Sequence, residues 1–256
     1  MSKNTRLCHT LLAAAVFAST CHAGPPSTSK WNLVFSDDFN GSALDTSKWT
    51  PDNGPTQPTP AWLAQYLSTR WADNVVLSDG ICHLVIRKQE RVKGVPWTAA
   101  SISTAQFSQQ YGYFEARIRY AGGSGVNNAF WLDTGGVDSE AGQHFEIDIN
   151  EGHYPAEMNL NYHIWSGETD HPDAKKLSRM EDLSQDFHVY GLEWDSQQLV
   201  WYIDDKEIWR QPITTGPGQT KVILGTMVML WAGPVNDSLA NKSMDVDWVH
   251  VYQKAN

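Results

Sequence analysis

Three carboxylic acids lie close together in one short segment, at Glu146, Asp148 and Glu151. Alternate residues of an extended strand face the same side, so Glu146 and Asp148 would face outward while the apolar residues between them face the core. Strict alternation would direct Glu151 inward, where an unpaired carboxylate is costly. We therefore expect a β-bulge near Asn150, because one extra residue returns Glu151 to the face of the other two acids.

Two carboxyl groups on one surface suit the cleavage of a glycosidic bond. A retaining mechanism needs them about 5–5.5 Å apart, and an inverting mechanism about 6.5–9.5 Å. With the bulge counted out, the Cα atoms of Glu146 and Glu151 would stand about 13 Å apart, and their side chains can lean together over Asp148, which favours the retaining spacing. Neighbouring like charges separate the two titrations, so one glutamate would keep its proton and the other stay ionised. The pattern does not say which, and alone it also fits a solvated acidic strand.

Short strand-like runs separated by turn residues must position these acids. Alternation is plain at 113–119 and 199–204, and helical periodicity is nearly absent. This spacing predicts an all-β fold, a two-sheet antiparallel β-sandwich, in which 175–186 is the one place where a short helix could form. The expected strands are 33–35, 75–77, 81–87, 113–119, 129–132, 145–149, 158–165, 187–194, 199–204, 221–230 and 244–252.

Composition narrows the class of partner. The 256 residues carry 19 Lys and Arg against 29 Asp and Glu, a formal net charge of -10, which would repel nucleic acid. The 12 Trp suit either a large β core or a groove that stacks on sugar rings. No run after the N-terminal segment approaches the roughly 20 apolar residues of a membrane span.

The N-terminal residues have the pattern of a secretory signal peptide. Lys3 and Arg6 precede an apolar run at 11–18, and Ala23 offers a small residue for cleavage. We expect residues 1–23 to be removed, residues 24–30 to form a flexible leader, and the protein to be secreted or periplasmic. The alternative is a lipid anchor on Cys21.

Cleavage after Ala23 would leave Cys82 as the remaining cysteine, so no intramolecular disulfide could form. Cys82 lies in a strand-like run at 81–86, where we expect a buried, inert thiol rather than a nucleophile.

The wider sequence resembles glycoside hydrolase family 16, over about residues 31–253. Besides the E-x-D-x-x-E strand, the matching segments occur in the order of the family. They are FSDDFN at 35–40, NVVLSDG at 74–80, YGYFEARI at 111–118, NAFWL at 128–132, FHVYGLEW at 187–194 and DWVHVY at 247–252.

The resemblance implies a jelly-roll, concanavalin A-like domain over 31–254 with a substrate groove on its concave face. It implies Glu146 as the nucleophile, Glu151 as the acid/base and Asp148 as the modulator between them. The bulged spacing is that of laminarinases, agarases and carrageenases. The segments MNLNYH at 158–163, KVIL at 221–224 and LWAG at 230–233 look closer to lichenases. The resemblance therefore implies the reaction more clearly than it implies the polysaccharide that is cleaved.

Substrate binding is expected from aromatic and polar residues across the groove. Trp131, Trp165 and Trp231 are expected in strands, with core packing as the alternative to stacking on sugars. Asn161 and His163 lie two residues apart, so they would share a face near Glu151. His144 precedes the expected nucleophile by two residues. Together the substrate-binding predictions are Trp131, His144, Asn161, His163, Trp165 and Trp231.

The resemblance also implies a structural calcium on the convex side. Asp247 would supply a carboxylate, with Asp38 and Gly80 supplying carbonyl oxygens, and oxygen-only ligation suits Ca²⁺. No cofactor is expected for catalysis, since zinc motifs such as H-E-x-x-H are missing from the sequence.

These features predict a secreted, monomeric, endo-acting retaining glycosidase of β-linked polysaccharide, with β-1,3- or mixed β-1,3/1,4-glucan as substrate. The alternatives are an agarose- or carrageenan-type galactan hydrolase, or a transglycosylase with the same strand. A carbohydrate-binding jelly roll without activity would be favoured had any of the three acids been lost. No nucleic-acid partner and no membrane span are expected.

Overall fold

The computed structural model describes residues 24–25, 30–54, 64–135, 144–165, 173–213 and 218–255. The predicted signal peptide at 1–23, with Cys8 and Cys21, lies outside the described residues, as does part of the predicted leader. The predicted domain extent of 31–254 stays a prediction.

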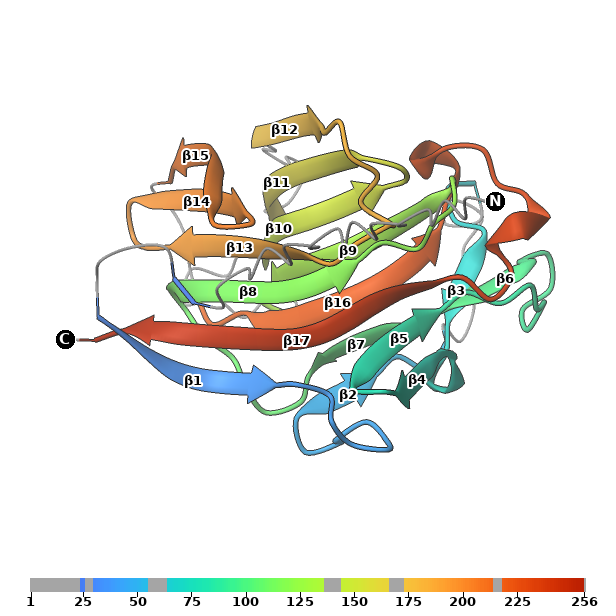
Figure 1. Ribbon diagram of the computed structural model, residues 1–256, viewed down its shortest axis with the longest axis horizontal. Coiled ribbons are helices and arrows are strands. Elements are labelled where there is room, and N and C mark those ends of the chain that lie inside the picture. Colours follow the sequence, from blue (N-terminus) through green and yellow to red (C-terminus); the bar gives the residue numbers. More distant parts are fainter. Residues whose placement is uncertain are drawn as a thin grey trace, which may run out of the picture.

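Two large antiparallel sheets pack face to face (Figure 1). The first, called here the β10 sheet, has the order β12 (Asp173–Ser178), β11 (Glu157–Trp165), β10 (His144–His153), β9 (Val126–Asp133), β16 (Lys221–Val228), β7 (Ser101–Thr104) and β2 (Trp49–Pro51). The second, the β17 sheet, has the order β15 (Lys206–Pro212), β14 (Gln198–Ile203), β13 (His188–Trp194), β8 (Gly112–Arg119), β17 (Ser243–Lys254), β5 (Ile81–Val85) and β4 (Val75–Ser78), while β1 (Trp31–Asp37) pairs with β17. The predicted two-sheet sandwich is confirmed.

The remaining elements are short. A parallel pair is formed by β3 (Ser68–Arg70) and β6 (Trp97–Ala99). The helices among the described residues are single 3-10 turns, η1 (Ala72–Asn74), η2 (Leu230–Ala232) and η3 (Asp237–Leu239). No helix in the described part of the chain has the length and apolar character needed to cross a membrane.

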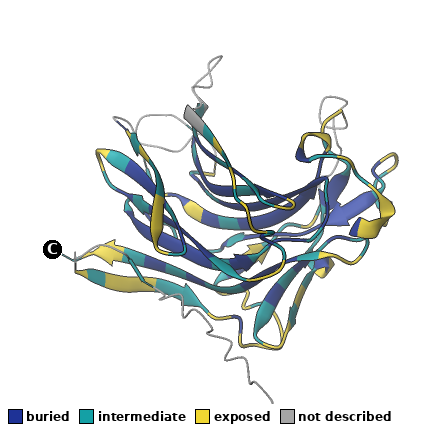
Figure 2. Cartoon of the chain, turned by 45° about the horizontal axis from the view of Figure 1, so that its top comes forward, coloured by how far each residue is buried: buried dark blue, intermediate teal, exposed yellow. Residues whose placement is uncertain are grey.

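The core fills the space between the sheets (Figure 2). Phe145, Ile147 and Ile149 of β10 enter it with at most 2% of their surface exposed, as the alternation predicts. Trp201 of β14 is fully buried on the opposite side and stacks on Trp209, with ring centroids 4.4 Å apart. The core thus holds one face of β10 rigidly, which fixes where its other face points.

Cys82 is fully buried in β5, as predicted. Burial raises the pKa of its thiol to about 12, since a thiolate would lose its hydration there. The thiol is therefore protonated at physiological pH and inert as a nucleophile.

No helix forms over 175–186, the one segment where the sequence left room for one. Residues 173–178 form β12, which pairs with β11 at the edge of the β10 sheet, with Leu160 opposite Lys175 and Glu157 opposite Ser178. Pairing with the preceding strand satisfies the backbone there. Asp182 then accepts hydrogen bonds from the backbone N–H and the hydroxyl of Ser184, which stabilises a turn rather than a helix.

Candidate active site

Strand β10 carries a β-bulge between Asp148 and Glu151. Asp148 pairs with Asn161 of β11 and Glu151 pairs with Asn159, so three steps along β10 match two along β11. Toward β9, the register shifts between Asp148 and Asn150. The predicted bulge is confirmed.

Glu146, Asp148 and Glu151 line one cleft of about 340 Å³. Because of the bulge, Glu151 joins the outward face of the strand instead of following the isoleucines into the core. The predicted shared surface of the three acids is confirmed. The other lining residues are Tyr66, Arg70, Asn127, Ala129, Trp131, Met227, Met229 and Trp231.

Amide groups hold the carboxylates of Asp148 and Glu151. Asn127 donates from Nδ2 to Oε1 of Glu151 at 2.8 Å, and Asn161 donates to its Oε2 at 2.9 Å. The same amide of Asn161 lies 3.2 Å from Oδ2 of Asp148, and His163 Nε2 lies 3.4 Å from that oxygen. The predicted neighbours Asn161 and His163 therefore bind the acids themselves, and their contact with substrate stays a prediction.

Glu151 has an unusual protonation equilibrium. Burial raises the pKa of its carboxyl group to about 8, and the negative charges of Asp148 and Glu146 act in the same direction. The hydrogen bond from Asn127 and the nearby His163 oppose the shift without cancelling it. At neutral pH, Glu151 therefore holds a proton beside a carboxylate cluster, which is the state a general acid requires.

The raised pKa of Glu151 predicts a pH-dependent cost to stability. Below pH 4.5 the carboxyl is protonated in both states; between pH 4.5 and about 8 the unfolded chain ionises while the folded protein keeps its proton. Stability is therefore lost as pH rises through this window. Glu151→Gln cannot ionise, so between pH 5 and 9 the wild-type melting temperature should fall about 10 °C more than that of the variant. Differential scanning calorimetry at both pH values measures this.

Glu207→Gln is the matched control for this experiment. Glu207 is exposed, and its hydrogen bonds with Arg210 lower the pKa of its carboxyl, so it titrates below the window. Its melting curve should follow that of the wild type from pH 5 to 9. Parallel curves for Glu151→Gln and the wild type would contradict the assigned pKa of Glu151.

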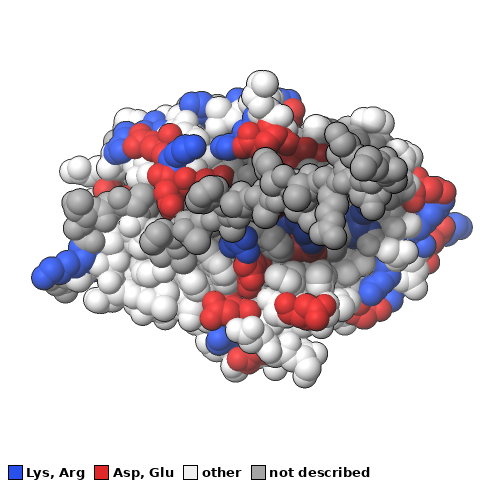
Figure 3. Space-filling model, in the orientation of Figure 1, with Lys and Arg blue, Asp and Glu red and all other residues white. Residues whose placement is uncertain are grey.

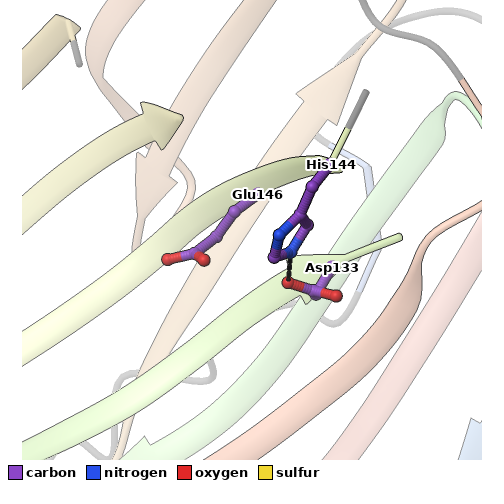
Figure 4. A group of neighbouring side chains, drawn as sticks. All are labelled: Asp133, His144 and Glu146. Atoms are coloured by element: carbon purple, nitrogen blue, oxygen red, sulfur yellow. Dashed lines mark hydrogen bonds and ion pairs between the residues drawn. The ribbon is translucent and has the colours of Figure 1, made fainter. Parts of the chain in front are cut away.

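His144 contacts an acid that the sequence did not single out. Its Nε2 lies 2.6 Å from Oδ2 of Asp133, at the end of β9, and Glu146 projects from the same face of β10 (Figure 4). Asp133 is the register partner of Glu146, and it also accepts from the backbone N–H of Gly135. The Asp133–His144 pair thus flanks Glu146. Contact of His144 with substrate stays a prediction.

Side chains in and beside the cleft could also hold a metal ion. Among the described residues, two groups place one ligand atom from each of three residues within 4.8 Å, namely Asp133, His144 and Glu146, and Glu146, Asp148 and His163. Glu146 belongs to both groups, so a cation in either would compete with any reaction that Glu146 performs.

The three predicted groove tryptophans have different positions. Trp131 lies in β9 and lines the cleft, opposite Asp148 in the register. Trp231 also lines the cleft and is 47% exposed, but the prediction that it lies in a strand is wrong, since it belongs to η2. Its ring contacts His153 edge-on at 4.7 Å. The backbone of Trp165 pairs with His144, and its side chain lies outside the described residues.

Several residues that line the cleft were not predicted from the sequence. Asn127 shares the cleft face of β9 with Trp131, four residues away, so the period of two could have found it. Arg70 and Tyr66 come from a distant part of the chain, and no local pattern in the sequence marks them. Arg70 pairs with Asp52 at 3.5 Å, so its positive charge is partly offset.

The residues named for calcium have other partners. The carboxylate of Asp247 pairs with the guanidinium of Arg117, and Oδ1 of Asp38 lies 3.1 Å from His250 Nε2. Asp247 is the one side-chain carboxylate predicted to bind calcium. With the guanidinium of Arg117 already paired to it, this arrangement does not fit a cation site, because Arg117 and the calcium ion would compete for the same carboxylate. Calcium binding stays a prediction that requires Arg117 to move, and a thermal-shift titration with CaCl2 would test it.

One family model and several curated proteins are similar to this chain. A family model described as glycosyl hydrolases family 16 matches residues 64–250. Endo-1,3-1,4-beta-glycanase EglC of Rhizobium meliloti is 28% identical over 242 residues, which cover 86% of this chain and 51% of that protein. Beta-porphyranase D of Zobellia galactanivorans is 26% identical over 200 residues, covering 66% of this chain and 45% of that protein. This chain thus spans about half the length of these curated relatives.

A solved structure shares the fold. The endo-beta-1,3-glucanase from Pyrococcus furiosus superposes with a TM-score of 0.76 at 25% identity, and the match covers 89% of this chain and 96% of that chain.

Proposed function

This chain belongs to glycosyl hydrolases family 16, and from that membership we propose that it is an endo-acting, retaining glycosidase of β-linked polysaccharide. The single observation that carries the proposal is the placement of Glu146, Asp148 and Glu151 on one cleft, where burial and the charge of Asp148 raise the pKa of Glu151. A protonated and an ionised carboxyl on one surface are the two groups that glycosidic cleavage needs.

In the proposed mechanism, Glu151 donates its proton to the glycosidic oxygen while Glu146 attacks the anomeric carbon. A bond forms between Glu146 and the sugar, and the bond to the leaving sugar breaks. Glu151, now ionised, takes a proton from water, which attacks the anomeric carbon and releases Glu146. Two inversions leave the configuration retained.

Asp148 has a positioning role in this scheme. It is 3% exposed and accepts from Asn161, which also binds Glu151. Its charge raises the pKa of Glu151, so it supports the protonated state of the acid. Asn161 bridges the two acids and fixes their relative orientation.

The charge of the cleft favours a neutral substrate. Three carboxyl groups line it, and Arg70, the one cation among the described lining residues, is paired with Asp52. Carrageenan carries sulfate esters, and the described lining offers no cation other than the paired Arg70 to bind them. On the face shown in Figure 3, the described basic side chains are scattered among acidic ones rather than gathered into a patch. We propose β-1,3- or mixed β-1,3/1,4-glucan as the substrate.

A substrate panel tests this proposal. Purified protein is incubated with laminarin, barley mixed-linkage glucan, agarose and carrageenan, and reducing ends are measured. We expect release from one or both glucans, no release from carrageenan, and products that are oligosaccharides rather than single sugars.

Agarose is the informative alternative in this panel, because it is neutral like the glucans, so the charge of the cleft does not separate them. Cleavage of agarose alone would move the substrate to the galactans and leave the mechanism in place. NMR of the first product formed reports its anomer, and an inverted configuration would overturn the retaining mechanism. Inactivity of the wild type on every polysaccharide would favour a binding module.

We also propose that the protein is exported. The pattern at 1–23 supports cleavage after Ala23, as argued from the sequence. N-terminal sequencing of the protein recovered from its native compartment should begin at Gly24. Retention of Lys3 and Arg6 would refute the signal peptide, and a diacylglyceryl group on Cys21 would favour the lipid anchor.

A further inference from the structure

The residue inserted by the bulge is an asparagine whose side chain is completely buried. Asn150 has 0% exposure, although its neighbours on the inward side of β10 are apolar. Both the oxygen and the nitrogen of its side-chain amide form hydrogen bonds. Oδ1 accepts from the hydroxyl of Tyr120 at 2.6 Å, and Nδ2 donates to the backbone carbonyl of Asn128 at 2.9 Å. An unpaired amide would be costly at this depth, so these two bonds fix where Asn150 lies.

The partner of Asn150 comes from the opposite sheet. Tyr120 follows β8 directly, is 2% exposed, and stacks on Tyr190 of β13 with ring centroids 5.8 Å apart. A second contact crosses the core at the same place, since Nε1 of Trp201 in β14 donates to the backbone carbonyl of Asp148 at 2.9 Å. The β17 sheet therefore binds both ends of the bulge by side-chain hydrogen bonds.

The residue after Glu151 is matched to this contact. A Cβ atom on Gly152 would lie 2.0 Å from Cζ of Tyr120, so a glycine is required for the ring to reach Asn150. The carbonyl of Gly152 accepts from Asn128 Nδ2 at 2.9 Å. The tyrosine, the asparagine and the glycine are thus fitted to one another directly behind the acid.

Register decides where the acid points. A slip of one residue would exchange the faces of Asn150 and Glu151, placing the carboxyl in the core and the amide in the cleft. We propose that the Tyr120–Asn150 hydrogen bond sets this register, so that both are positioning residues that hold Glu151 toward the cleft. The inference rests on the proposed function, because it concerns the general acid of that reaction.

The test uses Tyr120→Phe, which keeps the ring and removes the hydroxyl. Two substrates are compared: laminarin or mixed-linkage glucan, whose leaving sugar needs a proton, and a 2,4-dinitrophenyl β-glucan oligosaccharide, whose leaving group does not. Pre-steady-state release of dinitrophenol reports glycosylation alone. If Glu151 is misplaced, we expect kcat on the glucan to fall about tenfold or more while the dinitrophenol burst rate stays within about twofold. The basic limb of the pH profile should also move, since a displaced Glu151 no longer has the burial and the neighbouring charge of Asp148 that set its pKa.

A matched control is Tyr113→Phe, which removes another buried hydroxyl from the other end of β8. This variant should leave the ratio of kcat on the glucan to the dinitrophenol burst rate unchanged. If Tyr120→Phe does not fold, the double variant Tyr120→Phe with Asn150→Leu removes both members of the pair, at the cost of one donor to the carbonyl of Asn128, and it should show the same selective loss.

Equal losses on both substrates and an unmoved pH profile would overturn the inference while the proposed function stands. A wild type that cleaves no polysaccharide would overturn the proposed function and the inference with it.

Discussion

Replacing Glu146 by alanine is expected to reduce kcat by about 10⁵-fold, because the group that bonds to the anomeric carbon is lost and no other step replaces it. The smaller side chain leaves room in the cleft, so added azide should attack the sugar directly. Glu151 still protonates the leaving group in this variant. The product is then a glycosyl azide of inverted configuration, which NMR identifies.

Glu207→Ala is the matched control for this result, since Glu207 is exposed and pairs with Arg210 outside the cleft. It should retain wild-type activity and give no glycosyl azide. A Glu146→Ala protein that yields a retained azide would reverse the assignment of the two glutamates, whereas unchanged hydrolysis would remove Glu146 from the reaction.

Replacing Glu151 by alanine is expected to have a leaving-group-dependent effect. On glucan, kcat should fall about 10³- to 10⁴-fold, because the proton for the leaving sugar is missing. With a dinitrophenyl leaving group the glycosyl-enzyme still forms, and a burst of dinitrophenol should appear before a slow second step. Azide should then attack the intermediate and give a product of retained configuration.

The two alanine variants are thus distinguished by the stereochemistry of one product. Glu151→Gln serves as the isosteric control, since it keeps the size of the side chain and should show the same burst. Loss of the burst in both Glu151 variants would contradict the role of Glu151 as a proton donor, because activity on an activated substrate does not need one.

The sequence predicted most of the strands that position the site, because local alternation marks them. The face of Phe145, Ile147 and Ile149 and the bulge behind Glu151 follow from the cost of burying a carboxylate, which is a local argument. Strand β12 was missed because it exists through pairing with β11, a contact that no pattern in 173–178 reveals. The end of β16 before Trp231 was missed for the opposite reason: the apolar run continues past Val228, and the turn depends on Gly233 at φ +112°.

The role of each glutamate was harder to predict from the sequence than the set of residues that form the site. The acidic strand is nearly symmetric about Asp148, so its pattern gave two glutamates without separating acid from nucleophile. The difference arises from the surroundings of Glu151: burial in the cleft and the charge of Asp148 raise its pKa, against the opposing hydrogen bond from Asn127. Asp133 beside His144 and the pair Tyr120–Asn150 likewise depend on contacts between separate strands. Such contacts require the three-dimensional arrangement.

The position of β17 constrains the order in which this protein can fold. It is the last of the described strands along the chain, yet it lies in the middle of its sheet between β8 and β5, and it also pairs with β1, with Trp31 opposite Lys254. During synthesis, β8 and β5 therefore each keep an open edge until β17 leaves the ribosome, and open edges favour aggregation. Contacts so distant in sequence also make folding slow. We therefore expect the sheet that supports the bulge from behind to be completed only once β17 has been made.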